Sequence, residues 1–527
     1  MRWLLAAACW GTVGAATGSV QEPARTDPSK DELAVVGMLA LGMFEEARRE
    51  NRVPPDVWGA AAEAAGAFQA GDAARAYRSA LRAVHRLRGL RVDEAIDEAI
   101  DLNVVLDRAL AEPGESVRVR PEGPKIAATS LEVTLLDGAG RVLKPLGELG
   151  GEEIPRPREL AIPCRALKAG LFEAAYRLKA RDGRILAEGR RRFRIVPGIA
   201  ERIGRLRKLV DRMSADPRLS ADVRRRTAIE SVIWKLEVLE RARREFVGTL
   251  VQSLRPMTAL LVRWAGQGDV DWETDPVDPE RDMPDLEAMA KALEAGKDPL
   301  AGRAGDLRLA YRSPVDGTLQ PFRVFVPSGG VSGSPRPAVV ALHGAGCDEN
   351  TYFDRYPEPR GGGNLFKKLG QERGYVLVCP RGRGPMAGYE GNGGRDVLDV
   401  VERVKLLWGA ASEPVFLTGH SMGAHGTWIL GTRHPDLFAA AAPVAGIPPD
   451  PSAVPLERAV SLPVLFVAAA RDRGVPVERA REWARRAQRV LKRLRYVEYP
   501  DDDHYSIGVN SLPAVFDFFD ACRKPGK

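Results

Sequence analysis

The segment that most constrains this chain is Gly419-His420-Ser421-Met422-Gly423, a serine with a glycine two residues to each side. An apolar run at residues 414–417 precedes it, and a helix-like stretch at residues 424–432 follows it. A strand that turns directly into a helix leaves room only for small neighbours, so glycine at both flanks favours a sharp turn that exposes the serine hydroxyl. The N-terminus of the helix would then lie beside the serine, where its N–H groups stabilise negative charge. The segment predicts a nucleophile elbow.

The Gly-x-Ser-x-Gly pattern needs support from its surroundings, because with 53 Gly in 527 residues roughly one chain in five of this composition contains one by chance. Upstream, the short apolar run 338–342 ends in His343-Gly344-Ala345-Gly346. A His-Gly loop in this place can present a backbone N–H toward an acyl oxygen. We therefore expect the N–H groups of Ala345 and Met422 to form an oxyanion hole.

An acid and a base follow the serine at the ends of two further predicted strands. Residues 463–470 form another buried-strand run, which leads to Asp472, and residues 496–499 alternate before the loop that carries His504. Serine is a weak nucleophile until a base takes its proton, and histidine, with an ordinary pKa near ~6.5, can accept and return that proton. The acid would hold the imidazole in the required tautomer. Ser421, His504 and Asp472 are thus predicted to form a catalytic triad.

Residues 306–527 resemble α/β-hydrolases of the poly(3-hydroxybutyrate) depolymerase, feruloyl esterase and predicted-peptidase branch, which is similar to the catalytic domain of prolyl oligopeptidases. The chain order of serine, acid and histidine is the order of that superfamily. The resemblance is carried by LHGAG at 342–346, GHSMGAHGTWILGTRHPDLFAAAAPVAG at 419–446, RDRGVPVERA at 471–480 and YPDDDH at 499–504. It implies a mostly parallel sheet flanked by helices.

The chemistry that this resemblance implies is cleavage of carboxylic esters through an acyl-enzyme intermediate. Ser-His-Asp machinery also serves amide bonds, so a serine peptidase of the prolyl oligopeptidase type is the alternative. A catalytically inactive binding protein is the alternative from another class. The predicted mechanism requires neither a metal nor an organic cofactor, and the expected partner is an ester or peptide substrate that could be polymeric.

Other residues compete for these roles. Five of the six histidines lie between residues 343 and 504, which raises a metal site as an alternative, although no HExxH pair is present. His425 is the main rival for the base, and the acidic run at residues 501–503 is the rival for the acid. We interpret Asp396 and Asp399 as charges at a helix N-terminus, and Tyr389 and Trp428 as packing residues. The five clustered histidines are His343, His420, His425, His434 and His504.

The first residues and the composition predict the cellular setting. Residues 1–18 combine Arg2 with an apolar stretch and small residues, which is typical of a secretory signal peptide and predicts export to the periplasm or the medium. No later segment approaches the ~20 apolar residues that a membrane span requires. The net charge of +7 comes from interspersed charges of both signs, so the basic stretches 190–194 and 202–212 are interpreted as solvated faces and not as nucleic-acid sites.

Cysteine spacing excludes a zinc motif and leaves disulfides open. Cys164, Cys347, Cys379 and Cys522 follow the predicted signal peptide, with no CxxC pair among them. One or two bridges could form after export, and the spacing does not pair them.

Changes in periodicity divide the chain into four parts after the predicted signal peptide. Helical patterns predict an N-terminal helical domain at 29–112, including a helix through 92–110, and alternation with turns predicts a small antiparallel β-sandwich at 115–197. Helices return in 198–296, which includes an Asp- and Pro-rich linker at 268–284. The α/β-hydrolase domain is expected at 306–527. The parts before it would recognise, position or cover the substrate, and the oligomeric state stays open.

Overall fold

The structure is a computed structural model that describes residues 30–49, 51–124, 127–150, 160–248, 250–264, 276–329, 336–358, 361, 363–408 and 414–523. The predicted signal peptide at residues 1–18 lies outside these ranges. The chain forms two compact units. The N-terminal unit comprises Met1–Leu206 and Leu236–Met283, and the α/β unit comprises Arg207–Lys235 and Pro284–Lys527.

Helices of the N-terminal unit surround two sheets. Helix α4, for example, begins where the Asp72 carboxylate accepts a hydrogen bond from the Arg75 N–H, which satisfies one of the unpaired donors of its first turn. The helices that lie within this unit are α2 (Lys30–Arg49), α3 (Val57–Gln69), α4 (Ala73–Leu87), α5 (Glu94–Ala99), α9 (Leu250–Ser253) and α10 (Pro256–Trp264).

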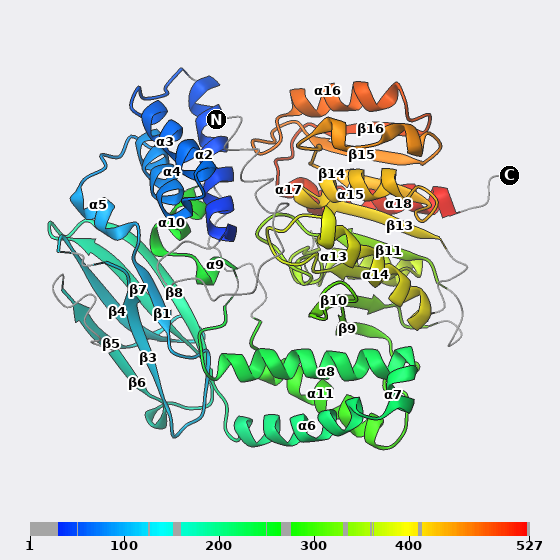
Figure 1. The fold of residues 1–527 in the computed structure, drawn as a ribbon, viewed down its shortest axis with the longest axis horizontal. Coiled ribbons are helices and arrows are strands. Elements are labelled where there is room, and N and C mark those ends of the chain that lie inside the picture. The colour runs from blue at the N-terminus through cyan, green and yellow to red at the C-terminus, as the bar shows by residue number, and fades with distance from the viewer. Residues whose placement is uncertain are drawn as a thin grey trace. The chain divides into compact units, whose positions relative to one another are not determined.

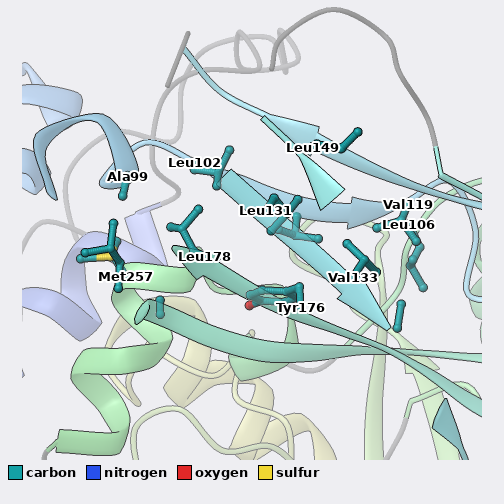
Figure 2. Close-up of a cluster of buried hydrophobic side chains, with 14 of the residues drawn as sticks. Ala99, Leu102, Leu106, Val119, Leu131, Val133, Leu149, Tyr176, Leu178 and Met257 are labelled. Atoms are coloured by element: carbon teal, nitrogen blue, oxygen red, sulfur yellow. The ribbon is translucent and has the colours of Figure 1, made fainter. Parts of the chain in front are cut away.

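The two sheets of the N-terminal unit contribute to one hydrophobic core with α2 to α5 and α10. Figure 2 shows Leu131 and Val133 of β4 near Tyr176 and Leu178 of β7, as expected for alternate residues of paired strands. The five-stranded sheet has the order β2 (Leu110–Ala111), β8 (Ile185–Ile195), β7 (Gly170–Ala180), β4 (Thr129–Asp137), β5 (Val142–Leu149); the three-stranded sheet has the order β1 (Asn103–Leu106), β3 (Ser116–Glu122), β6 (Leu160–Pro163).

The predicted helix through 92–110 is wrong. Helix α5 ends at Ala99, and the chain continues into strands β1 and β2. In β1, buried Val104 and Leu106 alternate with partly exposed neighbours, and this period of two fits a strand better than a helix. The β-structure therefore begins before residue 115, and the pairing of β2 with β8 is parallel.

The prediction that the basic stretch 190–194 is a solvated face is wrong for Arg191, which is buried. The guanidinium of Arg191 is buried and donates to the backbone oxygens of Val104 and Leu254 at 2.6 and 2.9 Å. Its neighbours Arg190 and Arg192 pair with the buried carboxylate of Glu173. Arg191 is thus part of the interior of the N-terminal unit, whereas Arg190 keeps an exposed side chain.

The α/β unit is built on one eight-stranded sheet with the order β16-β15-β14-β13-β11-β12-β10-β9 (Figure 1). The strands from β16 to β12 are parallel, and β10 and β9 add an antiparallel hairpin at one edge. The bounds are β9 (Gly305–Arg312), β10 (Leu319–Val326), β11 (Ala338–Leu342), β12 (Val376–Pro380), β13 (Val415–His420), β14 (Ala440–Val444), β15 (Val464–Ala469) and β16 (Leu494–Tyr499).

Every residue of strands β11, β12, β14 and β15 is buried, as expected for parallel strands that helices cover on both faces. The carboxyl ends of β11, β13, β15 and β16 lead to His343, Ser421, Asp472 and His504. The helices are α7 (Pro217–Ala221), α12 (Thr351–Asp354), α13 (Leu365–Arg373), α14 (Gly391–Trp408), α15 (Met422–Arg433), α16 (Val477–Gln488), α17 (Ser506–Asn510) and α18 (Leu512–Arg523). Parallel strands thus bring the predicted site residues to one edge of the sheet.

The α/β unit also includes residues that the predicted domain at 306–527 leaves out. Three helices cross between the two units along the chain: α6 (Ile199–Ser214), α8 (Val223–Ala242) and α11 (Pro279–Glu294). In α8, the Ser231 Oγ accepts a hydrogen bond from the Ala310 N–H of edge strand β9 at 2.8 Å, and Glu230 pairs with Arg403 at 3.3 Å. Residues 207–235 therefore contribute polar contacts to the edge of the sheet.

Residues 268–275 of the predicted linker at 268–284 lie outside the described ranges, and its last part is helical. Helix α11 begins at Pro279 and contains Pro284, so the last residues of the expected linker are helical. Pro279 is tolerated as the first residue of this helix because the first N–H groups have no acceptor within the helix, whereas Pro284 lies inside it. The acidic first turn of α11, with Glu280 and Asp282, also suits a helix N-terminus.

Within the described ranges, no helix has both the length and the apolar character that crossing a bilayer requires. In the same ranges, Cys164, Cys347, Cys379 and Cys522 are not joined by disulfides.

Replacing Ser231 with alanine should destabilise the α/β unit. The hydroxyl is buried, and its loss leaves the Ala310 N–H without its acceptor, which costs about 1–3 kcal/mol in free energy of unfolding. Urea unfolding of S231A measures this cost. Ser214 is exposed and its hydroxyl bonds within α6, so S214A is the control and should change stability by less than about 0.5 kcal/mol. Equal stability of S231A and wild type would contradict the role of α8 at the sheet edge.

Candidate active site

Ser421 lies at the sharp turn between β13 and α15. Its backbone has φ 57° and ψ −115°, a conformation that costs a non-glycine residue about 1–3 kcal/mol. The Ser421 N–H donates to the Val444 oxygen at 3.0 Å, which holds the strained residue to the neighbouring strand β14. The predicted strand, turn and helix are all present, with α15 beginning at Met422.

The flanking glycines provide room for close packing, as the sequence suggested, and not freedom of their own backbone. Neither Gly419 nor Gly423 has positive φ, so the turn does not use their backbone freedom. A Cβ on Gly423 would lie 1.9 Å from the Leu342 oxygen, and one on Gly419 would lie 2.3 Å from the Gly423 oxygen. Glycine is required here because the start of α15 packs directly against the end of β11.

The structure brings the three predicted triad residues together. The Ser421 Oγ lies 2.9 Å from the His504 Nε2, and the His504 Nδ1 lies 2.8 and 3.0 Å from the two carboxylate oxygens of Asp472. The side chain of Asp472 is buried, while that of His504 keeps 14% of its surface exposed. A base that contacts both the serine and a buried acid has the geometry of general base catalysis.

Backbone groups hold Asp472 and His504 in place. The Asp472 Oδ1 accepts a hydrogen bond from the Val475 N–H at 2.7 Å. A Cβ on Gly474 would lie 3.2 Å from the His504 ring, so the acid loop passes closely over the imidazole. The acid loop therefore both supplies the carboxylate and limits the movement of the ring.

His420, the residue before the nucleophile, contacts the base in a way that sequence reasoning missed. Its Nε2 lies 2.5 Å from the backbone oxygen of His504. A carbonyl only accepts, so this nitrogen carries the hydrogen, which defines the tautomer of the neutral ring. Burial lowers the pKa of His420 to about 4, so the ring is neutral at pH 7. Nothing in the sequence distinguishes a histidine that makes this contact from any other residue at the second position of an elbow.

The rival base and the rival acid occupy other positions. His425 lies on α15, and the hydrogen-bond partner of Ser421 is His504. Burial, together with the charges of His504 and Arg479, lowers the pKa of His425 to about 4. In the acidic run, Asp501 pairs with Arg471, and the other two carboxylates accept hydrogen bonds from residues of the following turn and α17.

The five histidines that raised a metal site make other contacts: the rings of His420 and His504 are neighbours in the candidate site. His343 is buried, with its Nδ1 2.9 Å from the Gly344 oxygen and its Nε2 2.8 Å from the Arg381 oxygen. Through the part of the chain that the structure describes, no group of three or more His, Cys, Asp or Glu side chains is arranged to hold a metal ion.

The predicted oxyanion loop, residues 343–346, lies beside the nucleophile. A Cβ on Gly344 would lie 3.6 Å from the Ser421 Cβ, so the loop approaches the serine closely. Ala345 follows in this loop and is partly exposed. Met422 is the first residue of α15, where a backbone N–H has no acceptor within the helix. The two predicted donors therefore border the serine from different elements.

A second loop, residues 381–389 after β12, supports the oxyanion loop, and we call it the support loop. The Gly346 N–H donates to the Pro385 oxygen at 2.9 Å, and the Arg381 oxygen contacts the His343 ring. The Tyr389 hydroxyl donates to the His343 oxygen at 3.2 Å. Sequence reasoning did not assign this loop. The sequence feature that could have identified the support loop is the glycine-rich pattern that directly follows a buried strand.

Asp396 corrects another expectation. Its carboxylate is buried within α14 instead of serving as an exposed charge at the helix N-terminus. It accepts a hydrogen bond from the Tyr311 hydroxyl at 2.7 Å and forms an ion pair with the Arg383 Nε at 2.7 Å. Burial raises the pKa of Asp396.

Tyr389 and Trp428 are buried, as their interpretation as packing residues requires.

Comparisons with known proteins find esterases that are similar to part of this chain. Feruloyl esterase B of Talaromyces stipitatus is 31% identical over 144 residues, which cover 25% of this chain and 37% of that protein. Acetylxylan esterase of Coprinopsis cinerea is 31% identical over 139 residues, which cover 21% of this chain and 35% of that protein. This chain contains an α/β-hydrolase domain. The resemblance predicted from the motifs is confirmed at the level of the superfamily.

Other comparisons add less. S-formylglutathione hydrolase from Staphylococcus aureus covers 41% of this chain and 99% of its own at 18% identity, with a TM-score of 0.34. No protein-family model matches the chain. The chain spans about a third to a half of the length of the curated relatives that it matches.

Replacing Gly423 with alanine should disrupt the elbow of the hydrolase domain. The new Cβ would overlap the Leu342 oxygen, and relieving that overlap should cost about 3 kcal/mol in free energy of unfolding. The control is Gly431 on the same helix, where a Cβ meets its nearest atoms at 3.4 and 3.5 Å. Because alanine favours a helix, G431A should stay within about 1 kcal/mol of wild type. Urea unfolding of the two variants separates them, and equal losses would contradict the packing argument.

Proposed function

We propose that this protein hydrolyses carboxylic esters through an acyl-enzyme intermediate on Ser421. The observation that carries the proposal is the hydrogen-bonded series from the Ser421 Oγ to the His504 Nε2 at 2.9 Å and from the His504 Nδ1 to Asp472 at 2.8 Å. Esterases among the curated relatives support ester cleavage over the peptidase alternative. The intact triad argues against an inactive binding protein.

In the acylation step, the Ser421 oxygen attacks the carbonyl carbon of the ester while His504 takes the hydroxyl proton at Nε2. The buried carboxylate of Asp472 stabilises the imidazolium that forms. The carbonyl oxygen becomes an oxyanion, which the N–H groups of Ala345 and Met422 would hold. Each such donor lowers the barrier by about 3 kcal/mol. The intermediate collapses when the C–O bond to the alcohol breaks and His504 returns the proton to the leaving oxygen.

Deacylation repeats the same steps with water. His504 removes a proton from a water molecule, whose oxygen attacks the acyl carbon, and the bond to the Ser421 oxygen breaks as that oxygen regains a proton. The carboxylic acid is then released. The partial exposure of the His504 side chain is compatible with entry of water to the ring.

The substrate class is suggested by the relatives. A feruloyl esterase and an acetylxylan esterase are among them, so we include feruloyl and acetyl esters, free or attached to a polysaccharide, among the substrates of this chain. The N-terminal unit would recognise or position a large substrate. Export follows from the signal-peptide pattern at residues 1–18 and stays a prediction, because those residues lie outside the described structure.

Replacing Ser421 with alanine should abolish covalent labelling by a fluorophosphonate and lower kcat for p-nitrophenyl acetate by about 10⁴- to 10⁶-fold. The hydroxyl forms the covalent bond in each case. Methyl ferulate, acetylated xylan and an aminoacyl nitroanilide, tested in parallel, report the acyl group and the preference for esters over amides. Undiminished turnover by S421A would contradict the triad, and faster cleavage of the nitroanilide would favour the peptidase.

Replacing Asp472 with asparagine should lower kcat by about 10⁴-fold, because an amide can no longer hold the imidazole in its working tautomer. Asp501 is the matched control in the rival acidic run, since its side chain is exposed and pairs with Arg471 at the surface. D501N should keep kcat within about twofold of wild type. Steady-state kinetics on p-nitrophenyl acetate compare the two variants. A larger loss in D501N than in D472N would mean that the acid is assigned wrongly.

A further inference from the structure

The support loop is bonded to the oxyanion loop through backbone oxygens. Its two backbone oxygens, from Arg381 and Pro385, contact His343 and Gly346 at 2.8 and 2.9 Å. These contacts lie on both sides of Ala345 in the chain. Any displacement of the support loop is therefore transmitted to the N–H that is proposed to hold the oxyanion.

The backbone at the centre of the support loop is strained at a non-glycine residue. Gly382, Arg383 and Gly384 all have positive φ, of 60°, 74° and 143°. Glycine adopts these values without cost, whereas a side chain at such a position costs about 1–3 kcal/mol and persists only where its surroundings impose it. An arginine in the middle of the three residues indicates that its side-chain contacts offset this cost.

Those contacts hold the guanidinium of Arg383 on three sides. Its Nε pairs with Asp396 at 2.7 Å, its Nη2 donates to the Ser313 Oγ at 2.6 Å, and its Nη1 contacts Asp316 and donates to the Thr318 Oγ1 at 3.1 Å. The side chain is only 12% exposed. A planar guanidinium presents several donors in fixed directions, so its Nη groups can donate to Ser313 and Thr318 while its charge pairs with Asp396.

Asp396, the ion-pair partner of Arg383, is itself buried and hydrogen-bonded. Asp396 is buried in the first half of α14, and its other carboxylate oxygen accepts a hydrogen bond from the buried Tyr311 hydroxyl of β9. The Arg403 guanidinium lies over the Tyr311 ring, 5.2 Å from its centroid. The Arg383 guanidinium is thus connected to helix α14 through Asp396 and to edge strand β9 through Tyr311.

We propose that Arg383 is a positioning residue for the oxyanion hole. Its ion pair with Asp396 keeps the support loop in its strained conformation, and the support loop in turn holds the Ala345 N–H where the oxyanion forms. The inference rests on the proposed esterase function, and it adds a residue that does not touch the substrate. The predicted effect is on the transition state, because the oxyanion exists only after attack by Ser421.

The expected decrease in kcat follows from the effect that a displaced oxyanion-hole N–H has on the rate. A displacement of about 1 Å at a catalytic group lowers the rate by about 10²-fold, and a complete loss of one oxyanion donor costs about 10²- to 10³-fold. We therefore expect R383A to lower kcat for p-nitrophenyl acetate by about 10- to 100-fold while KM changes by less than about threefold. The rate is expressed per active site titrated with a fluorophosphonate, so that unfolded protein does not count.

The variant R383G separates positioning from stability. Glycine relieves the backbone strain at this residue, so R383G should be at least as stable as R383A in thermal unfolding. It still lacks the guanidinium, and its kcat should stay as low as that of R383A. R383K retains the charge but not the planar set of donors, so its kcat should lie between those of R383G and wild type. The control is R395A on α14, the helix that carries Asp396. It removes the ion pair between the exposed Arg395 and Asp399 and should leave kcat unchanged.

The outcomes distinguish this inference from the proposed function. A wild-type protein that does not hydrolyse p-nitrophenyl acetate, or an active S421A, contradicts the esterase itself. An active wild type with R383G within about twofold of its kcat overturns the positioning role. A low kcat in R383G with unchanged KM, full titration of the active site and an unfolding temperature no lower than that of R383A supports it.

Discussion

The close packing of α15 against the end of β11 is the contact on which the candidate site depends. Gly423 touches the Leu342 oxygen so closely that no side chain fits between them. This contact brings the oxyanion loop, which directly follows Leu342, next to Ser421, which directly precedes α15. The nucleophile and both predicted oxyanion donors are therefore positioned by one backbone approach. The parallel register of β11 with β13 aligns the two strand ends that make it possible.

Much of the α/β unit could be predicted from local patterns. The apolar runs before His343, Asp472 and His504 and the elbow around Ser421 are short, dense and bounded by loops, so each strand was assigned near its observed bounds. The order of serine, acid and histidine then implied that the carboxyl ends of these strands meet at one edge. The strand order of the sheet and the superfamily agree with that expectation.

Contacts between residues far apart in the chain were not predictable in this way. Ser231 of α8 accepts from Ala310 of β9, and nothing near either residue indicates the other. The charge of Asp396 suited a helix N-terminus on local grounds, but its partners Tyr311 and Arg383 lie on other elements. The helical prediction through 92–110 failed because a short strand of four residues leaves too little alternation to identify. Local patterns indicate elements, whereas buried polar partners depend on the assembled fold.

Backbone strain in the α/β unit is concentrated where the proposed chemistry needs fixed geometry. Its described non-glycine residues with positive φ are Arg383, Ser421 and Ala445. Ser421 is the proposed nucleophile, and Ala445 precedes Gly446, where an added Cβ would lie 2.4 Å from the backbone oxygen of Ser421. Strained residues persist only where the surrounding structure imposes their conformation. The buried sheet imposes it at Ser421 through the Val444 oxygen, and the Arg383 ion pair imposes it in the support loop. The contacts that impose strain at the nucleophile and in the support loop therefore also hold the oxyanion loop. The elbow at Ser421 and the support loop are both bonded to neighbouring elements of the α/β unit.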